Sequence, residues 1–98
     1  MKLYKDKDLM EEIDILDLGI VPAGEVKSFT FWVVNNSNAT LRSLEFTIEH
    51  EEVEILEAPK MLNAQSVDEL VIEWSASVTL KQGLRAKLRV RAEEFWGE

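Results

Sequence analysis

The clearest pattern in the chain is the alternation of apolar and polar side chains over short stretches. The most apolar window runs from Glu25 to Asn36, with Phe29, Phe31 and Val33 at every second position. This window is rich in aromatic and β-branched residues and has no Gly or Pro, which favours a largely buried strand over a helix. The polar run Asn35 to Thr40 follows it and has the composition of a loop. We therefore expect this window to form the central strand of a sheet.

Shorter stretches with the same period lie on both sides of the central window. They are centred on Ile13 and Ile15, on Leu44 to Ile48, on Val53 to Ile55, on Leu70 to Trp74 and on Leu84 to Ala92. Breaks separate them at steps of roughly 8–12 residues, and no sustained helical period appears. The pattern predicts an all-β fold, an immunoglobulin-like antiparallel β-sandwich of about seven strands. Residues 1–98 form one domain in this interpretation, with 1–12 as a hairpin or arm and 93–98 as a short C-terminal tail.

The predicted core collects the residues that would point between two sheets. These are Ile13, Ile15, Phe29, Phe31, Val33, Leu44, Phe46, Ile48, Ile55, Leu70, Ile72, Trp74, Leu88 and Val90. Gly19 is expected to mark a bulge or a close backbone approach. A β-turn is expected at Pro22-Ala23-Gly24, with Pro22 in the second position and Gly24 in the fourth.

Charge and cysteine usage restrict the classes of partner. The chain has 98 residues, with 19 acidic against 11 basic side chains and a net charge of −8. This balance disfavours nucleic acid and anionic membranes, both of which attract Lys and Arg. The absence of cysteine excludes disulfides and cysteine-ligated zinc and favours a cytoplasmic origin. Neither a signal peptide nor an apolar run of about 20 residues is visible.

No residue set in the sequence is typical of catalysis. There is one His, no Gly-rich phosphate loop, and no motif that places a base beside any Ser. The acidic residues between Asp6 and Asp14 raise the question of a calcium loop, but they lack its Gly and its regular ligand spacing. We expect a solvated turn there, and we predict a non-enzymatic protein with no metal and no cofactor.

Trp32 is the first candidate contact residue. It falls on the polar face of the central strand, opposite to Phe31 and Val33. One interpretation is that a loop or a neighbouring strand covers it. The other is that it anchors a partner, since Trp is enriched at interface hot spots.

The last predicted strand supplies a second candidate surface, because four basic residues alternate along one of its faces. In one interpretation they pair across strands with Glu45, Glu49 or Glu73. In the other they dock an acidic protein surface or another copy of the chain. The aromatic residues of the tail either pack back or reach a neighbour. The predicted contact residues are Trp32, Arg85, Lys87, Arg89, Arg91, Phe95 and Trp96.

Two segments carry a family resemblance. Leu16-Asp17-Leu18-Gly19-Ile20-Val21-Pro22-Ala23-Gly24-Glu25, followed by the strand Phe29 to Asn36, resembles the opening of immunoglobulin-like modules of the ASH (Hydin-like) and major-sperm-protein type. In those modules a run of the form D-x-G-x-V-x-x-G precedes a strand that ends in Asn. The resemblance covers roughly the first half of the domain and implies a β-sandwich. Ser37 to Leu41 replaces the Gly and Pro that often follow the Asn.

As a lone module, the chain also resembles the small immunoglobulin-like proteins that decorate or link tailed-phage particles. This similarity implies a virion component, either a capsid decoration protein or a head- or tail-associated protein. It would be assembled in the host cytoplasm and would bind a capsid or other virion protein, with a homo-oligomer as one form. The alternatives are a cytoplasmic adaptor domain and a carbohydrate-binding module. The last would require Trp32 or Trp96 on an open, flat face.

Overall fold

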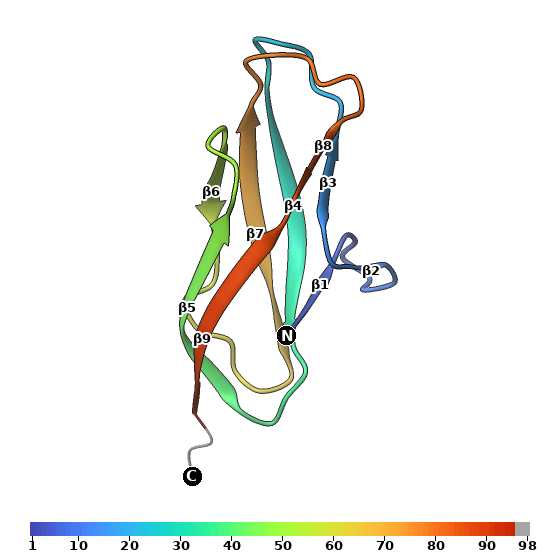
Figure 1. Cartoon of the computed structure of the whole chain (residues 1–98). Coiled ribbons are helices and arrows are strands. Elements are labelled where there is room, and N and C mark those ends of the chain that lie inside the picture. The colour runs from blue at the N-terminus through green and yellow to red at the C-terminus, as the bar shows by residue number, and fades with distance from the viewer. Residues whose placement is uncertain (96–98) are drawn as a thin grey trace.

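The computed structural model describes residues 1–95, which form nine strands (Figure 1). In chain order these strands are β1 (Lys2–Tyr4), β2 (Glu12–Ile13), β3 (Leu16–Gly19), β4 (Val26–Asn35), β5 (Thr40–Ile48), β6 (Val53–Glu57), β7 (Ser66–Ser75), β8 (Leu84–Ala86) and β9 (Leu88–Phe95). Every pair of neighbouring strands is antiparallel. No helix occurs in this part of the chain. The prediction of an all-β antiparallel fold is therefore confirmed.

The strands form one large sheet and two small ones. The large sheet has the order β2-β1-β4-β7-β6, and the small sheets are β3-β8 and β5-β9. Strands β8 and β9 are separated only by Lys87 and follow one another along a single diagonal path (Figure 1). This division, together with two short N-terminal strands, gives nine strands where about seven were expected.

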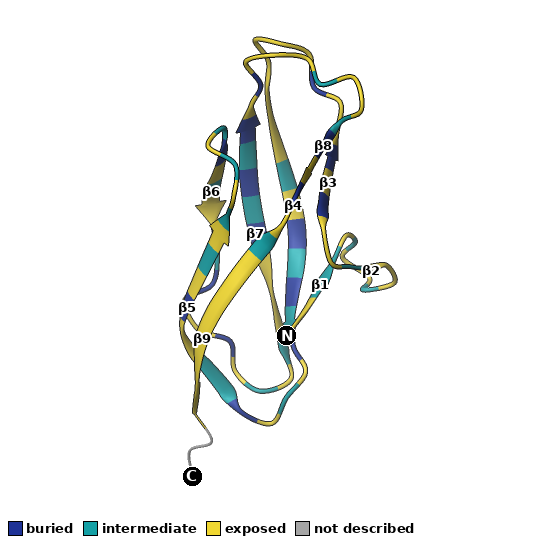
Figure 2. Cartoon of the chain, in the orientation of Figure 1, coloured by how far each residue is buried: buried dark blue, intermediate teal, exposed yellow. Residues whose placement is uncertain are grey.

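One buried cluster draws on all three sheets. The central part of β4 and β7 supplies its floor, with Val33, Leu70, Ile72 and Trp74 fully buried. Leu16 and Leu18 of β3, Leu44 of β5 and Leu84 of β8 also belong to it. Burial of each such side chain contributes about 1.5–3 kcal/mol. Figure 2 shows the buried residues gathered in β3, β4, β7 and β8, whereas β9 is almost wholly exposed.

Two predicted core residues are wrong. Ile15 is 40% exposed and Val90 is 36% exposed. Ile15 lies just outside β3, whose inward positions are Leu16 and Leu18, so the alternation starts one residue later than expected. Val90 points inward from β9. It lies past the end of the strands that cover Leu84 and Ala86, so no strand covers it.

Glycine and proline positions shape the start of the domain. Gly19 has a φ of 67°, and the β3–β8 register shifts between Asp17 and Gly19, so the predicted bulge is confirmed. The turn after it is present but lies one residue later than expected. The amide of Glu25 donates to the carbonyl of Pro22, which puts Gly24, with a φ of 87°, at the third position. This is the position where a type II turn requires a positive φ.

Candidate functional site

Strand β9 has a neighbour along only one of its edges. Seven of its eight residues pair with β5, from Leu88 opposite Ile48 to Phe95 opposite Thr40, and only Ala92 lacks a register partner. Strand β3 pairs with β8 but not with β9, and among residues 1–95 no other strand joins the β5-β9 sheet. The opposite edge of β9 therefore presents backbone N–H and C=O groups that no described strand uses.

The other sheet edges are shorter or covered. Strand β2 has two residues, and β6 has five with a bulge and exposed Glu54 and Glu57, features that discourage strand pairing. The first half of the outer edge of β5, up to Leu44, is closed by the loop before β7. There Leu41 and Leu62 exchange two backbone hydrogen bonds, and the amide of Leu44 donates to Lys60. The free edge of β9 is thus the longest one open to a new strand.

An apolar groove lies beside this free edge, between β9 and the N-terminal hairpin. It has a volume of about 250 Å³. Its lining residues are Met1, Lys2, Leu3, Glu12, Ile13, Asp14, Val33, Leu88 and Val90. Because Met1 and Val90 are both exposed, an added strand that covered this groove would bury apolar surface.

This groove was not predicted from the sequence, although the sequence contains one signal for it. The alternating stretch Leu84 to Ala92 is much longer than the stretch Leu16 to Leu18 that pairs with its start. When a strand is longer than the strand beside it, the inward-facing residues of the extra length stay exposed.

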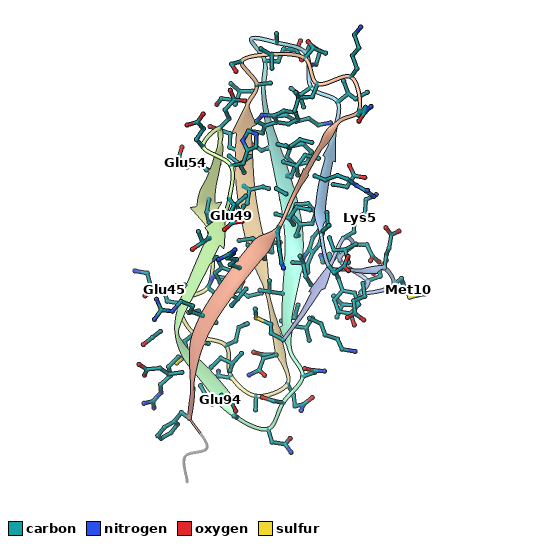
Figure 3. All side chains as sticks on the ribbon, viewed as in Figure 1. Lys5, Met10, Glu45, Glu49, Glu54 and Glu94 are labelled. Atoms are coloured by element: carbon teal, nitrogen blue, oxygen red, sulfur yellow. The ribbon has the colours of Figure 1, made fainter. Side chains whose placement is uncertain are left out.

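Three of the four basic residues of the last predicted strand form ion pairs with acidic residues of the same chain. Arg89 Nη2 lies 2.7 Å from Glu49 Oε1, and Arg91 Nη1 lies 4.0 Å from Glu45 Oε2. Arg85 Nε lies 3.9 Å from Asp17 Oδ2. Figure 3 labels Glu45 on β5 and Glu49 directly after the end of β5, beside β9.

Cross-strand pairing with Glu45 and Glu49, one of the two interpretations, is therefore present. Glu73 takes no part in it, because it pairs in register with Ser28 and Glu54 in the large sheet. The fourth basic residue, Lys87, is exposed at the junction of β8 and β9 and lines a shallow hollow of about 600 Å³ with Arg89 and Arg91.

Trp32 and the β9 edge belong to different sheets. Trp32 is on the outer face of the large sheet, in register with Tyr4 of β1 and Glu69 of β7. It is half-buried between them, and the half-buried Val34 lies two residues along the same face. The structure therefore does not bring Trp32 together with the basic residues of the last strand.

The predicted tail begins inside a strand. Phe95 ends β9, is 42% exposed, and lies under the guanidinium of Arg42 at 3.7 Å from ring centroid to Cζ. This contact is a cation–π interaction with a residue of the neighbouring strand. Trp96 lies outside the described residues.

The polar clusters elsewhere have structural roles. Glu52 accepts hydrogen bonds from the hydroxyl of Ser77 and from Nε1 of Trp74, and these bonds lower the pKa of its carboxyl group. In the N-terminal loop, backbone amides of Glu11 and Met10 donate to the carboxylate of Asp6 and lower its pKa. The Asp6 loop is therefore organised by its own backbone.

Within residues 1–95, no group of three or more His, Cys, Asp or Glu side chains is placed to hold a metal ion. In the same range, no helix is long and apolar enough to cross a membrane.

Comparisons with known proteins give no relative for this chain. No protein-family model, no curated protein and no solved structure matches it.

Proposed function

We propose that this chain is a non-enzymatic protein-interaction module that binds an extended segment of its partner along the free edge of β9. The observation that supports it is the eight-residue strand with one open edge beside an apolar groove. An added strand would satisfy the backbone groups of that edge, and its inward side chains would enter the groove. Backbone pairing would supply affinity and the groove would supply selectivity.

An immunoglobulin-like sandwich is the scaffold we infer for this module. It is supported by the antiparallel strands and by a single buried cluster shared between the large sheet and the two small ones. In such a scaffold the free part of β9 would lie at the edge of the second layer, where a further strand extends the sheet.

The biological setting we propose is a structural assembly, a virion component that decorates or links a phage particle. A free strand edge suits such a role, because strand addition joins subunits without a deep pocket. Mass spectrometry of purified particles tests this setting, and absence of the chain from them would exclude it. A cytoplasmic adaptor that uses the same edge is the alternative, and it would capture a soluble host protein instead.

The edge itself is tested with a library of random peptides selected on the immobilised full chain. The diagnostic variant is Ala92→Pro, because proline removes the amide in the middle of the free edge. Ala92 faces a bulge in β5 and has no register partner there, so β5 pairing should tolerate the change. Circular dichroism and thermal unfolding verify that the variant folds.

We expect the selected peptides to lose binding to Ala92→Pro and to keep it for Trp32→Ala, which lies on the other sheet. In NMR spectra of the wild-type chain, the peptides should shift the amide signals of residues 88–95 and of Leu3 and Ile13. Peptides that bind the folded Ala92→Pro variant as well as the wild type would overturn the proposal.

A further inference from the structure

We propose that the segment bound by the free edge of β9 is β9 of a second copy of this chain. The two strands would run antiparallel about a two-fold axis at Ala92 and join two β5-β9 sheets into one four-stranded sheet. This inference rests on the proposed function and names the partner. The observation that supports it is the distribution of charge along β9.

The outward face of β9 is complementary to itself. In chain order it presents Arg89, Arg91, Glu93 and Phe95, with the cations in the first half and the anion and the ring in the second. Antiparallel pairing about Ala92 places Arg91 opposite Glu93 of the second copy, and Arg89 opposite Phe95 of the second copy. The two-fold axis produces each pair twice, so the face gains two ion pairs and two cation–π contacts.

Neighbouring registers lack this match. A centre at Arg91 also pairs Arg89 with Glu93 of the second copy, but it puts the two copies of Arg91 directly opposite each other and loses the contact of Arg89 with Phe95. A centre at Val90 puts Arg89 opposite Arg91 of the second copy. Like charges in directly opposite positions destabilise a strand pair, so the charge pattern selects the register centred on Ala92.

The strand next to β9 extends the same pattern. Glu45 of β5 is in register with Arg91, and Arg42 of β5 is in register with Glu93. Across the four-stranded sheet a row would therefore read Glu45, Arg91, Glu93 of the second copy and Arg42 of the second copy. Charges alternate along the row, so each inner charge keeps its partner in β5 and gains another across the new interface. The Arg91–Glu45 ion pair of the single chain is compatible with the dimer.

The inward face is compatible with this register. Ala92 meets Ala92 of the second copy, which permits close approach of the two strands. Val90 lies opposite Glu94 of the second copy, whose methylene groups can cover it while the exposed carboxylate stays in water. Val90, exposed in the single chain, would become covered.

A charge-swap experiment tests both the partner and the register. The variants are Arg91→Glu and Glu93→Arg, studied alone and as an equal mixture by sedimentation equilibrium and native mass spectrometry. Each variant alone faces two like-charge pairs in the homodimer, so we expect its dimer dissociation constant to rise by about tenfold or more. In the mixture every pair is again of opposite charge, so the heterodimer should form preferentially. The two masses differ, which distinguishes it from the homodimers.

Matched controls separate this effect from net charge. Lys7→Glu in the N-terminal loop and Glu54→Arg on β6 make the same charge changes at exposed positions far from β9. They should leave the dimer unchanged, and thermal unfolding verifies that all variants fold. Ala92→Pro should also prevent dimerisation.

Three results would overturn the inference. These are a wild-type chain that stays monomeric at all concentrations, a dimer insensitive to both charge reversals, and a mixture without heterodimer. A monomer that still binds selected peptides in a manner abolished by Ala92→Pro would leave the proposed function standing and remove only the second copy as partner. A monomer whose peptides ignore Ala92→Pro would remove both.

Discussion

Asn35 shows how one polar residue can organise two loops. It ends β4 with 1% of its surface exposed. Its Nδ2 lies 2.8 Å from the carbonyl oxygen of Ala39, 3.1 Å from that of Leu62 and 3.0 Å from that of Asn63. Its Oδ1 accepts from the amide and the hydroxyl of Ser37. The amide side chain of Asn35 thus links the loops before β5 and β7.

Asn35→Ala is predicted to be strongly destabilising. It removes the hydrogen bonds that the buried Asn35 amide makes with three carbonyl groups and with Ser37, and each such bond contributes about 0.5–1.5 kcal/mol net. We expect the free energy of unfolding to fall by about 2–4 kcal/mol, measured by urea titration. The exposed neighbour Asn36, changed to Ala, serves as the control and should change it by less than about 0.5 kcal/mol. A similar, small effect of both substitutions would contradict the structural role of Asn35.

Glu52 gives a prediction on pH at the same scale. Hydrogen bonds from Ser77 and Trp74 hold its pKa below the ordinary value of 4.5. A carboxyl group whose pKa is lower in the folded state stabilises the fold at higher pH, and this stabilisation is lost as the pH falls through 4.5 and below. Glu52→Gln should therefore be less stable than the wild type at pH 7, and the difference should shrink in acid.

Thermal unfolding of both proteins at pH 7 and near pH 3 measures this change. Glu54→Gln, on the exposed edge of β6, removes the same charge without those hydrogen bonds and should show a smaller dependence on pH. A difference between wild type and Glu52→Gln that stays constant over this range would contradict the assignment.

At the scale of elements, β3 decides how the first part of the chain meets the core. Its two inward residues, Leu16 and Leu18, are at most 2% exposed, and the Gly19 bulge follows them. Gly83, with a φ of 78°, lies so close to Gly19 that an added Cβ would meet the Gly19 carbonyl oxygen at 3.0 Å. The β3–β8 pair therefore depends on a close backbone contact between two glycines.

Two substitutions at neighbouring positions test which residues at the start of β3 point inward. Leu16→Ala removes a fully buried side chain and should cost about 2–5 kcal/mol. Ile15→Ala removes one that is 40% exposed and should cost less than about 1 kcal/mol. Chemical denaturation measures both. If Ile15→Ala proved the more damaging change, the alternation of β3 would have the phase expected from sequence.

At the scale of the whole molecule, the two candidate surfaces lie on different sheets. The free edge belongs to β9, whereas Trp32 lies on the outer face of the large sheet between Tyr4 and Glu69. A chain with two separate surfaces can join a second copy through one and contact another protein through the other. This arrangement suits the proposed role in a structural assembly.

Trp32→Ala separates the two surfaces. Because Trp32 lies on the outer face of a different sheet from β9, we expect dimerisation in sedimentation equilibrium to be unchanged. Because it is half-buried, we expect a moderate loss of stability, about 1–2 kcal/mol, in thermal unfolding. Incorporation of the variant into purified particles should fall by more than this loss of stability explains. Loss of dimerisation in a variant that still folds would place Trp32 at the copy–copy interface instead.

The sequence by itself determined the all-β character of the fold and its longest strands. Alternation marked β4 and β7 with their inward residues Phe31, Val33 and Trp74, because side chains in a strand change face at every residue. The Asn at the end of β4 and the Gly19 bulge were also visible, since each belongs to a local motif.

Only the tertiary structure decided which alternating residues are covered. Val90 has the same local pattern as Leu84, yet it is exposed, because burial depends on a strand from elsewhere in the chain lying beside it. Strand β3 pairs with β8 and does not continue along β9. Nothing in the sequence of β9 indicates where β3 stops. The groove and the free edge therefore follow from the lengths and partners of strands distant in sequence, which alternation along one strand does not encode.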